Sequence, residues 1–351
     1  MKKTKIEEIL KNFLRKIWIG DRKYLKKIEK NYLLLRNYKN KNESDMRKEI
    51  SIFDFKNLSE EMGIYTNEYY FGNSLYGIIE NLRIFSGFEK EFVGAIEHGL
   101  YLGHDCNKEE INKSLKKILT FGESRKRYLE KFSSNKIYKI GPYINYAQSL
   151  YDEKKIKQIK KEIGKTLVFF PYHSIESIEA SYEKDKILKK LNELKSEFKT
   201  IIICLYYEDI NKKKADFYIK NGFKVVTAGH KYDKNFLNRL KSIIYLADET
   251  ASNAVGTHIG YCIYLKKPHF LIESQNNMIF KEEKIKKWFE GIKDSYLMEE
   301  NEIMEVFKER TSNITTAQEE ICNFYWGFKE IKSKKEIFKI LSGEKDEEVE
   351  Y

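Results

Sequence analysis

One stretch, residues 223–272, constrains the fold more than any other part of this 351-residue chain. Short apolar runs alternate there with amphipathic runs, and Gly, Pro, Asp, Ser or Asn marks each break. The pattern predicts strand, helix, strand, helix and strand over residues 224–227, 233–241, 242–246, 256–265 and 269–272. Such an alternation is typical of an α/β domain built on a parallel sheet.

Within this stretch, residues 248–258 predict a helix start that suits phosphate. We expect an apolar strand to end at Asp248, and four small or polar residues to stand where the next helix begins: Ser252, Asn253, Gly256 and Thr257. A helix N-terminus offers unpaired backbone N–H groups and the positive end of the helix dipole. His258, just inside the helix, could add a donor or a proton. The same residues also fit an ordinary N-cap and turn, so both interpretations stay open.

The chain length predicts two domains, since a single core beyond about 250 to 300 residues is unusual. We place an N-terminal domain with a helical N-terminus at 1–155, a C-terminal domain at 156–330, and a C-terminal helix and tail at 331–351. The continuous apolar run within 201–209 indicates a strand buried on both faces of a parallel sheet. Further strands are predicted over 50–55, 92–96, 118–121 and 166–170, and a long helix over 177–198.

The chain is basic, with 65 Lys and Arg against 54 Asp and Glu and a formal net charge of +11. Nucleic acid, an anionic membrane or a phosphorylated small molecule could each explain this excess. Because the Lys residues are spread over the whole chain, a solvated helix surface explains much of it as well. Neither a zinc finger nor an RNP-like aromatic pair occurs, so we do not expect a nucleic-acid partner.

Cysteine usage and hydropathy predict a cytoplasmic protein. The four cysteines lie far apart and form no CxxC pair, as is typical of free thiols in a reducing compartment. The basic, amphipathic first 20 residues lack a signal-peptide core, and no apolar run reaches 18 residues. Contact of this basic N-terminus with the inner face of the cell membrane stays open, because such helices can bind anionic lipid.

Five of the six histidines fall at or just past a predicted strand end or at a helix start. Histidines that merely fill space would also be scattered over helix surfaces, and an unperturbed histidine titrates near the operating pH of a general base. His269, inside the last predicted strand, is interpreted as structural. The five are His98, His104, His173, His230 and His258.

No dedicated metal site and no cofactor are expected. HxH, HExxH, Cys/His and DxD patterns are absent from the sequence. Charge on a departing phosphate can instead be stabilised by His, Ser, Thr and Asn side chains and by helix N-termini, without a metal ion.

Four short motifs resemble GT-B glycosyltransferases: EHG at 97–99, PYHS at 171–174, AGH at 228–230 and SNAVGTHIGYCIYLKKP at 252–268. The chain is similar over about residues 50–330 to bacterial transferases that build capsule, lipopolysaccharide or teichoic-acid-like polymers. These include sialyltransferase-like and Kdo-transferase-like enzymes and glycerophosphate polymerases. The resemblance implies an α/β chain with two Rossmann-like domains facing a central cleft.

The resemblance also implies roles for individual residues. His98 would deprotonate the acceptor hydroxyl, with Glu97 and Asp105 as alternative bases. The HP dipeptide of sialyltransferase-like enzymes is missing, since the candidate histidines stand in HS, HK and HI. The residues expected to bind nucleotide and phosphate are His173, Ser174, Gly229, His230, Ser252, Asn253, Gly256, Thr257 and His258.

Together these observations predict a metal-independent, inverting glycosyltransferase. It would move a sugar from a nucleotide-sugar, with a CMP-linked donor favoured, to a glycan or lipid-linked acceptor of the bacterial surface. A nucleotide-sugar 2-epimerase of the same fold is an alternative, and it would need carboxylates converging in the cleft. A non-enzymatic, basic nucleic-acid-binding protein is another, and it would bind in a salt-sensitive way.

Overall fold

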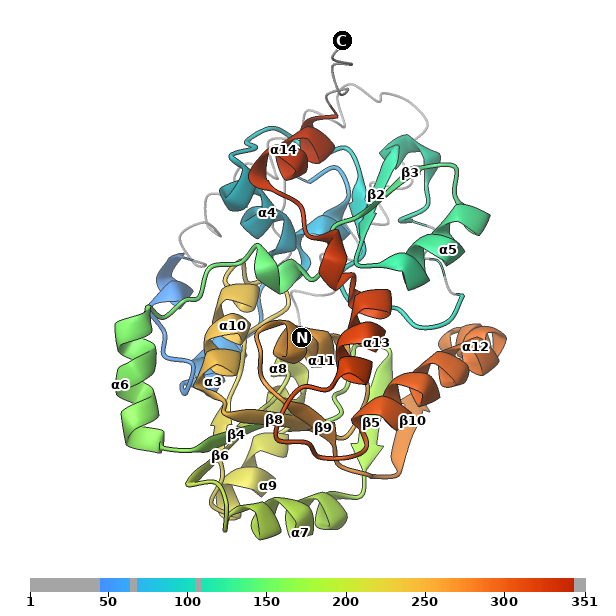
Figure 1. The fold of residues 1–351 in the computed structure, drawn as a ribbon. Coiled ribbons are helices and arrows are strands. Elements are labelled where there is room, and N and C mark those ends of the chain that lie inside the picture. Colours follow the sequence, from blue (N-terminus) through green and yellow to red (C-terminus); the bar gives the residue numbers. More distant parts are fainter. Residues whose placement is uncertain (1–44, 64–67, 105, 107–108, 344–351) are drawn as a thin grey trace, which may run out of the picture.

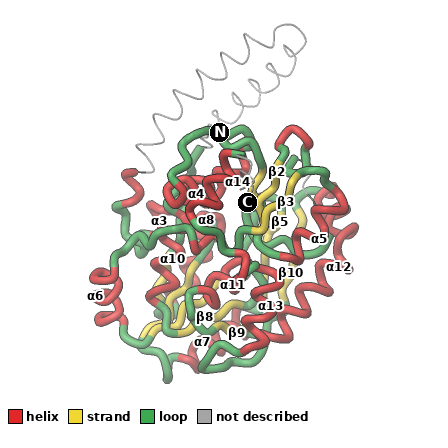
Figure 2. The backbone as a smooth tube through the Cα atoms, turned by 45° about the horizontal axis from the view of Figure 1, so that its top comes forward, coloured by secondary structure: helices red, strands yellow, loops and turns green. Residues whose placement is uncertain are grey.

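The computed structural model describes residues 45–63, 68–104, 106 and 109–343. Within them the chain builds two parallel sheets, one from each half of the sequence, with helices packed around both (Figure 1). In the turned view of Figure 2, strands β2 (Lys117–Thr120) and β3 (Lys136–Lys139) again lie apart from β8 (Glu249–Ser252) and β9 (His269–Leu271). The predicted helical N-terminus lies outside the described residues.

The N-terminal sheet has three parallel strands in the order β1-β2-β3, where β1 is Ala95–Ile96. Helix α5 (Glu123–Phe132) connects β2 to β3. The last described helix, α14 (Lys334–Ser342), returns to this half and packs beside α4 (Ile78–Ser86), as Figure 1 shows. Lys117 Nζ donates to the carbonyl of Ile340 at 2.7 Å, so the chain's end is tied to the first sheet.

The C-terminal sheet has five parallel strands in the order β7-β6-β4-β8-β9. Numbered by their sequence within this half, the order is 3-2-1-4-5, the Rossmann order. The winding therefore reverses between β4 (Thr166–Phe170) and β8, and the crevice at such a switch point is where ligands bind in open α/β sheets. The other two strands are β6 (Thr200–Cys204) and β7 (Lys224–Val226).

Helices cover the C-terminal sheet and connect its strands. They are α6 (Glu153–Ile163), α7 (Lys184–Leu194), α8 (Tyr207–Asn211), α9 (Lys214–Lys220), α10 (Phe236–Leu246) and α11 (Thr257–Tyr264). Short 3-10 helices stand at Phe71–Gly77, Lys113–Leu115, Tyr143–Asn145 and Phe328–Glu330. The predicted domain boundary at 155/156 falls in the first turn of α6 and stays a prediction.

A separate antiparallel pair, β5 (Ile178–Tyr182) with β10 (Asn276–Phe280), leads into α12 (Glu283–Phe307). The prediction of one helix over 177–198 is therefore wrong in its first part. Ala180 and Tyr182 are buried while the residues between and before them are more exposed, which is the period of a strand. Thr315 caps α13 (Thr316–Trp326) through a reciprocal bond with Gln318.

Two further strand predictions are wrong. Residues 242–246 belong to α10, whose wide buried face carries the isoleucines that suggested a strand, and the strand begins only at Glu249. Residues 50–55 form a turn in which Asp54 accepts a hydrogen bond from the N–H of Asn57 and caps α3 (Phe55–Leu58). The strand predicted at 166–170 is confirmed residue for residue, and those at 224–227 and 269–272 to within one residue.

One apolar cluster joins the two halves. Val168, Ile202 and Val226 project from one face of the C-terminal sheet into the same cluster as Leu119 and Phe121 of the N-terminal half. The opposite face of that sheet packs on α7 and α9 in a second cluster. The halves therefore share a core, which holds the edges of the two sheets in a defined relation.

The position of α11 is set by close packing on α13. Trp326 is fully buried, and its indole Nε1 donates to the carbonyl of Thr257 at 3.1 Å. Gly260 lets the two helices approach, because a Cβ atom there would lie 2.3 Å from the Trp326 ring. The first turn of α11 is thereby held at the cavity between the sheets.

Candidate active site between the two sheets

A cavity of about 450 Å³ lies where the strands of both sheets end. Its walls include residues 98–102 after β1, 170–173 at the end of β4, 204–206 at the end of β6, and 256–258 at the start of α11. Carboxyl ends of parallel strands are where α/β proteins hold their ligands. Both halves of the chain contribute to this one space.

The start of α11 faces the cavity without a side-chain cap from the described residues, since Gly256 stands at the N-cap position. The Ile259 N–H bonds the Gly256 carbonyl at 3.1 Å, which leaves the N–H groups of Thr257 and His258 in the first turn for a ligand. Thr257 Oγ1 accepts a hydrogen bond from the Leu100 N–H at 2.8 Å, which ties this helix start to the loop after β1. The contact links the two halves at the cavity itself.

His258 packs flat on Phe170, with ring centroids 4.9 Å apart and planes 21° from parallel. Burial lowers the pKa of His258 well below its usual value, and the neighbouring His269 and His173 lower it further. The ring is therefore neutral at pH 7. Its Nε2 atom is buried and meets no hydrogen-bond partner among the described residues.

His98 also lines the cavity and belongs to a hydrogen-bonded chain of three groups. The Tyr101 hydroxyl lies 3.0 Å from His98 Nδ1 and 3.2 Å from Glu110 Oε1. Tyr70 donates to the same Glu110 oxygen at 3.3 Å. When Tyr101 donates to Glu110, its oxygen accepts from His98 Nδ1–H. That tautomer leaves the lone pair of His98 on Nε2.

The surroundings shift the pKa values of His98 and Glu110, the two titratable groups joined by Tyr101. Removal from solvent lowers the pKa of His98 to about 4, with Glu97 acting in the opposite direction and Lys231 in the same one. Burial raises the pKa of Glu110 to about 8, and the charge of Glu97 adds to the rise. At neutral pH His98 is thus an unprotonated base, and Glu110 holds a proton.

Glu110 should make the stability of the fold depend on pH. Its pKa is about 8 in the folded protein against 4.5 as the ordinary value, so the folded state binds more protons between these limits. The stabilisation is fully present below pH 4.5 and is lost as the pH rises through about 8. Between pH 5 and pH 9 the free energy of unfolding should fall by about 3 kcal/mol less in Glu110→Gln than in the wild-type protein. Urea unfolding at pH 5, 7 and 9 measures it.

The neighbouring, exposed Glu109 offers the matched control. Glu109→Gln should follow the wild-type pH dependence. If Glu110→Gln also follows the wild-type curve, Glu110 is ionised in the folded protein and does not hold the proton assigned to it.

Glu97 does not line the cavity. Its side chain is 1% exposed and is held by Arg125 Nη2 at 2.5 Å and by the Thr120 hydroxyl at 2.6 Å. A carboxylate with these bonds favours a structural role over that of a free base. Asp105, the other alternative, lies outside the described residues.

The remaining sequence candidates divide into three groups. His173 lines the cavity beside Tyr206, with ring centroids 4.8 Å apart, and it joins His98, Gly256, Thr257 and His258 there. His230 lines a different, second pocket. The other candidates, Ser174, Gly229, Ser252 and Asn253, support the walls from behind.

The supporting contacts are specific. Ser252 Oγ lies 3.1 Å from His269 Nε2, and Asn253 Oδ1 accepts from the Tyr172 N–H at 2.7 Å. The Ser174 N–H bonds the Asp209 carboxylate, and Gly229 takes φ +101° against Arg239. His269 is buried in the sheet, as its structural interpretation required.

Sequence reasoning missed Glu110 and three tyrosines of the site, Tyr76, Tyr101 and Tyr206. The Tyr76 and Tyr206 hydroxyls lie 3.2 Å apart at the cavity wall. Tyr76 adopts φ +58°, a left-handed conformation that is rare outside glycine and clusters at functional sites. No sequence motif predicts a functional role for these residues, although Tyr101 is only three positions after His98.

Two parallel α/β sheets with a cavity between their strand ends define the GT-B fold class, as the sequence predicted. No protein-family model matches the chain, and neither does any curated protein.

Among solved structures, the wall teichoic acid polymerase TagF is similar, with 16% identity and a TM-score of 0.34 over 72% of this chain and 63% of that one. A TagF variant in which one histidine is replaced by alanine gives 14% identity and the same TM-score of 0.34, over 70% of this chain and 62% of that one. The chain thus spans less than two thirds of the length of these structures.

Proposed function

We propose that the chain is a glycosyltransferase that moves a sugar from a nucleotide-sugar to a hydroxyl of a bacterial surface glycan. One observation carries the proposal. A neutral histidine from the N-terminal half, His98, and an uncapped helix start from the C-terminal half, at Gly256, line the same cavity. A base and a phosphate site facing each other are what transfer to a hydroxyl needs.

The donor would bind at the switch point between β4 and β8. Backbone N–H groups of the first turn of α11 and the helix dipole would receive its phosphate. His258, within that turn, and His173, which lines the same cavity, would donate hydrogen bonds to the phosphate. We propose that these groups, without a metal ion, stabilise the charge on the departing nucleotide, and that a CMP-linked sugar is the first donor to test.

The acceptor hydroxyl would bind against His98. Its oxygen attacks the anomeric carbon of the donor sugar, and a new C–O bond forms. The bond from that carbon to the phosphate oxygen breaks, and its electron pair leaves with the nucleotide. The hydroxyl proton passes to Nε2 of His98. A single displacement of this kind inverts the configuration of the anomeric carbon.

The acceptor would be a glycan or lipid-linked chain, and we propose that the enzyme meets it at the inner face of the cell membrane. The basic composition of the chain supports this location. None of the helices in the described ranges is both long and apolar enough to cross a bilayer.

The 2-epimerase alternative requires carboxylates in the cleft. No Asp or Glu stands among the described residues that line the cavity. Glu110 lies behind two lining residues, within 3.2 Å of the Tyr101 hydroxyl and 3.8 Å of His98 Nδ1. We therefore do not propose that reaction.

A thermal-shift panel of CMP, CDP, UDP and GDP and their sugar conjugates tests the donor half. At about a hundred times its dissociation constant, the bound nucleotide should stabilise the protein by roughly 2.7 kcal/mol. We expect one nucleotide to raise the melting temperature without added magnesium, and His173→Ala to reduce that rise. His104→Ala is the control, because His104 does not line the cavity.

The donor assignment fails if no nucleotide raises the melting temperature while a nucleic acid or anionic lipid does. In that case the basic surface would be the binding surface, as in the non-enzymatic alternative.

A further inference from the structure

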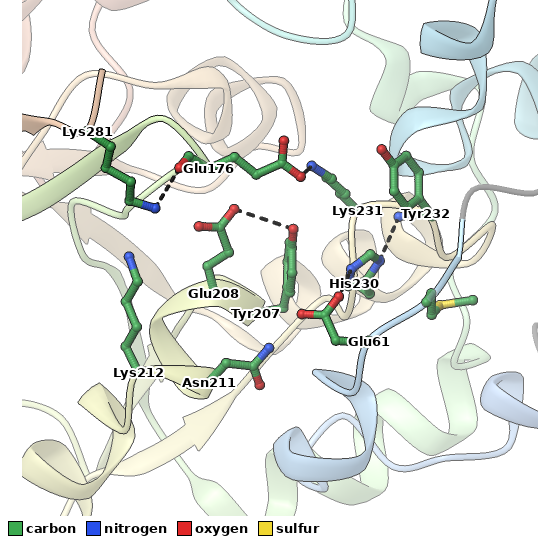
Figure 3. A pocket seen from close by; sticks show the side chains of 11 residues that line it. Glu61, Glu176, Tyr207, Glu208, Asn211, Lys212, His230, Lys231, Tyr232 and Lys281 are labelled. Carbon is green, nitrogen blue, oxygen red and sulfur yellow. Dashed lines mark hydrogen bonds and ion pairs between the residues drawn. The ribbon is translucent and has the colours of Figure 1, made fainter. Parts of the chain in front are cut away.

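A second pocket, of about 340 Å³, opens beside the cavity (Figure 3). Residues 207–212 and 230–232, which follow β6 and β7, form most of it, together with residues 61 and 62, Glu176 and Lys281. It therefore lies toward the β7 edge of the sheet, away from the switch point between β4 and β8. A nucleotide at the switch point would leave this pocket free.

At three places along the chain, one residue lines the cavity and a residue one or two positions later lines the second pocket. The cavity members of these pairs are Ile175, Tyr206 and Ala228, and the pocket members are Glu176, Tyr207 and His230. The three loops that hold these pairs thus form a shared wall. In Figure 3 the ion pair between Lys231 and Glu176 connects two of them, and the Lys231 carbonyl accepts from the Tyr76 N–H at 2.6 Å. A chain-like ligand could pass from one space to the other over this wall.

The charges around the second pocket cancel. It has three lysines, Lys212, Lys231 and Lys281, and three glutamates, Glu61, Glu176 and Glu208. His230 adds no charge at neutral pH, because burial lowers its pKa to about 3 and Lys231 and Arg47 lower it further. A phosphate would meet the glutamates and a cation the lysines. The lining suits a neutral ligand that both donates and accepts hydrogen bonds.

Aromatic and polar side chains lie side by side in the second pocket. His230 is 2% exposed, and its Nδ1 accepts from the Tyr232 N–H at 3.2 Å, so its proton stands on Nε2. That nitrogen lies 3.7 Å from the Glu61 carboxylate, beyond hydrogen-bond distance. The Tyr207 ring packs on His230 with centroids 4.1 Å apart, and its hydroxyl donates to Glu208 at 3.4 Å.

We infer that the second pocket binds a neutral sugar unit of the acceptor glycan, next to the unit that carries the reacting hydroxyl. Carbohydrate hydroxyls pair with carboxylates and ammonium groups together, and the C–H face of a sugar ring packs on an aromatic ring. This inference rests on the proposed function, since it takes the acceptor to be a glycan.

Saturation-transfer NMR tests the pocket with methyl glycosides of glucose, galactose and N-acetylglucosamine. Inorganic phosphate, which has no C–H proton, is the charged comparison and is followed by 31P line broadening. We expect at least one glycoside to bind the full-length protein. Glu208→Gln should weaken that binding about tenfold, because a hydrogen bond to a carboxylate is replaced by a neutral one. Lys220→Ala, on the exposed surface of α9 outside the pocket, should leave it unchanged.

Three results would overturn the inference: no glycoside binds, a glycoside binds Glu208→Gln as tightly as wild type, or phosphate alone binds and is lost in Lys212→Ala. The nucleotide thermal shift separates this failure from that of the proposed function. A shift that persists in Glu208→Gln leaves the donor site intact when the sugar pocket fails, whereas a protein that answers to no nucleotide fails at the donor site first.

Discussion

Glu97→Gln should unfold at a much lower urea concentration than the wild-type protein, with a loss of about 3–5 kcal/mol in the free energy of unfolding. Glu97 and Arg125 are each 1% exposed and lie 2.5 Å apart. Burial alone would lower the pKa of Arg125, and the Glu97 carboxylate more than offsets this, so the net direction is upward. Removing the carboxylate takes from the buried guanidinium the negative charge that Glu97 supplies at 2.5 Å.

The matched control is a surface ion pair on the same helix, Lys126 with Glu130, where both side chains reach solvent. Glu130→Gln should change the free energy of unfolding by no more than about 0.5 kcal/mol. Replacing both buried partners, in Glu97→Leu with Arg125→Met, should recover much of the loss. If Glu97→Gln is as stable as wild type and yet loses transfer, Glu97 is the base and the structural role is wrong.

The strands that the sequence predicted well are those whose pattern has one physical meaning. Residues 166–170 form an apolar run bounded by Gly164 and Pro171, too short for a helix, and every one of them is buried in β4. Residues 242–246 carry a similar run, but they continue an amphipathic segment that began at Phe236. A buried helix and a buried strand share this composition, and only the packing of α10 distinguishes them.

That one error displaced part of the predicted site. With the strand placed at 242–246, Ser252 and Asn253 were assigned to the start of the next helix. Ser252 in fact ends β8, where its hydroxyl bonds His269, and only Gly256 and Thr257 stand at the helix start. The residue types were suited to a ligand, but neither Ser252 nor Asn253 lines the cavity.

Strand order decides which of the predicted histidines line the cavity. His98 and His173 line the same cavity because both follow strands whose carboxyl ends face that space. His230 has the same local pattern but follows β7, at the edge of the sheet and two strands from β4. Sequence periodicity gives strand ends without their order, so it could not separate this histidine from the others. Glu110 was missed because its contact with Tyr101 and Tyr70 exists only in the folded chain.

His98→Asn should abolish most of the transfer reaction while leaving the donor site intact. A positioned general base contributes about 10²- to 10⁴-fold to a rate, and we expect a loss of kcat in that range. The nucleotide-induced thermal shift should be unchanged, because the proposed phosphate site is built from the start of α11 with His173 and His258 and does not include His98. The measurement is nucleotide release from the donor that the thermal-shift panel selects. In the wild-type protein, the rate should fall only as the pH drops toward about 4, where His98 becomes protonated.

Tyr101→Phe and Glu110→Gln separate the base from the groups that orient it. Tyr101→Phe removes the hydroxyl that lies 3.0 Å from Nδ1, so His98 can take either tautomer and kcat should fall by about tenfold. Glu110→Gln keeps an acceptor for Tyr101 and should lose less. His104→Asn, outside the cavity, is the control and should retain full activity. Equal losses for His98→Asn and His104→Asn would deny His98 any special role, and full activity in His98→Asn would assign the proton transfer to another group.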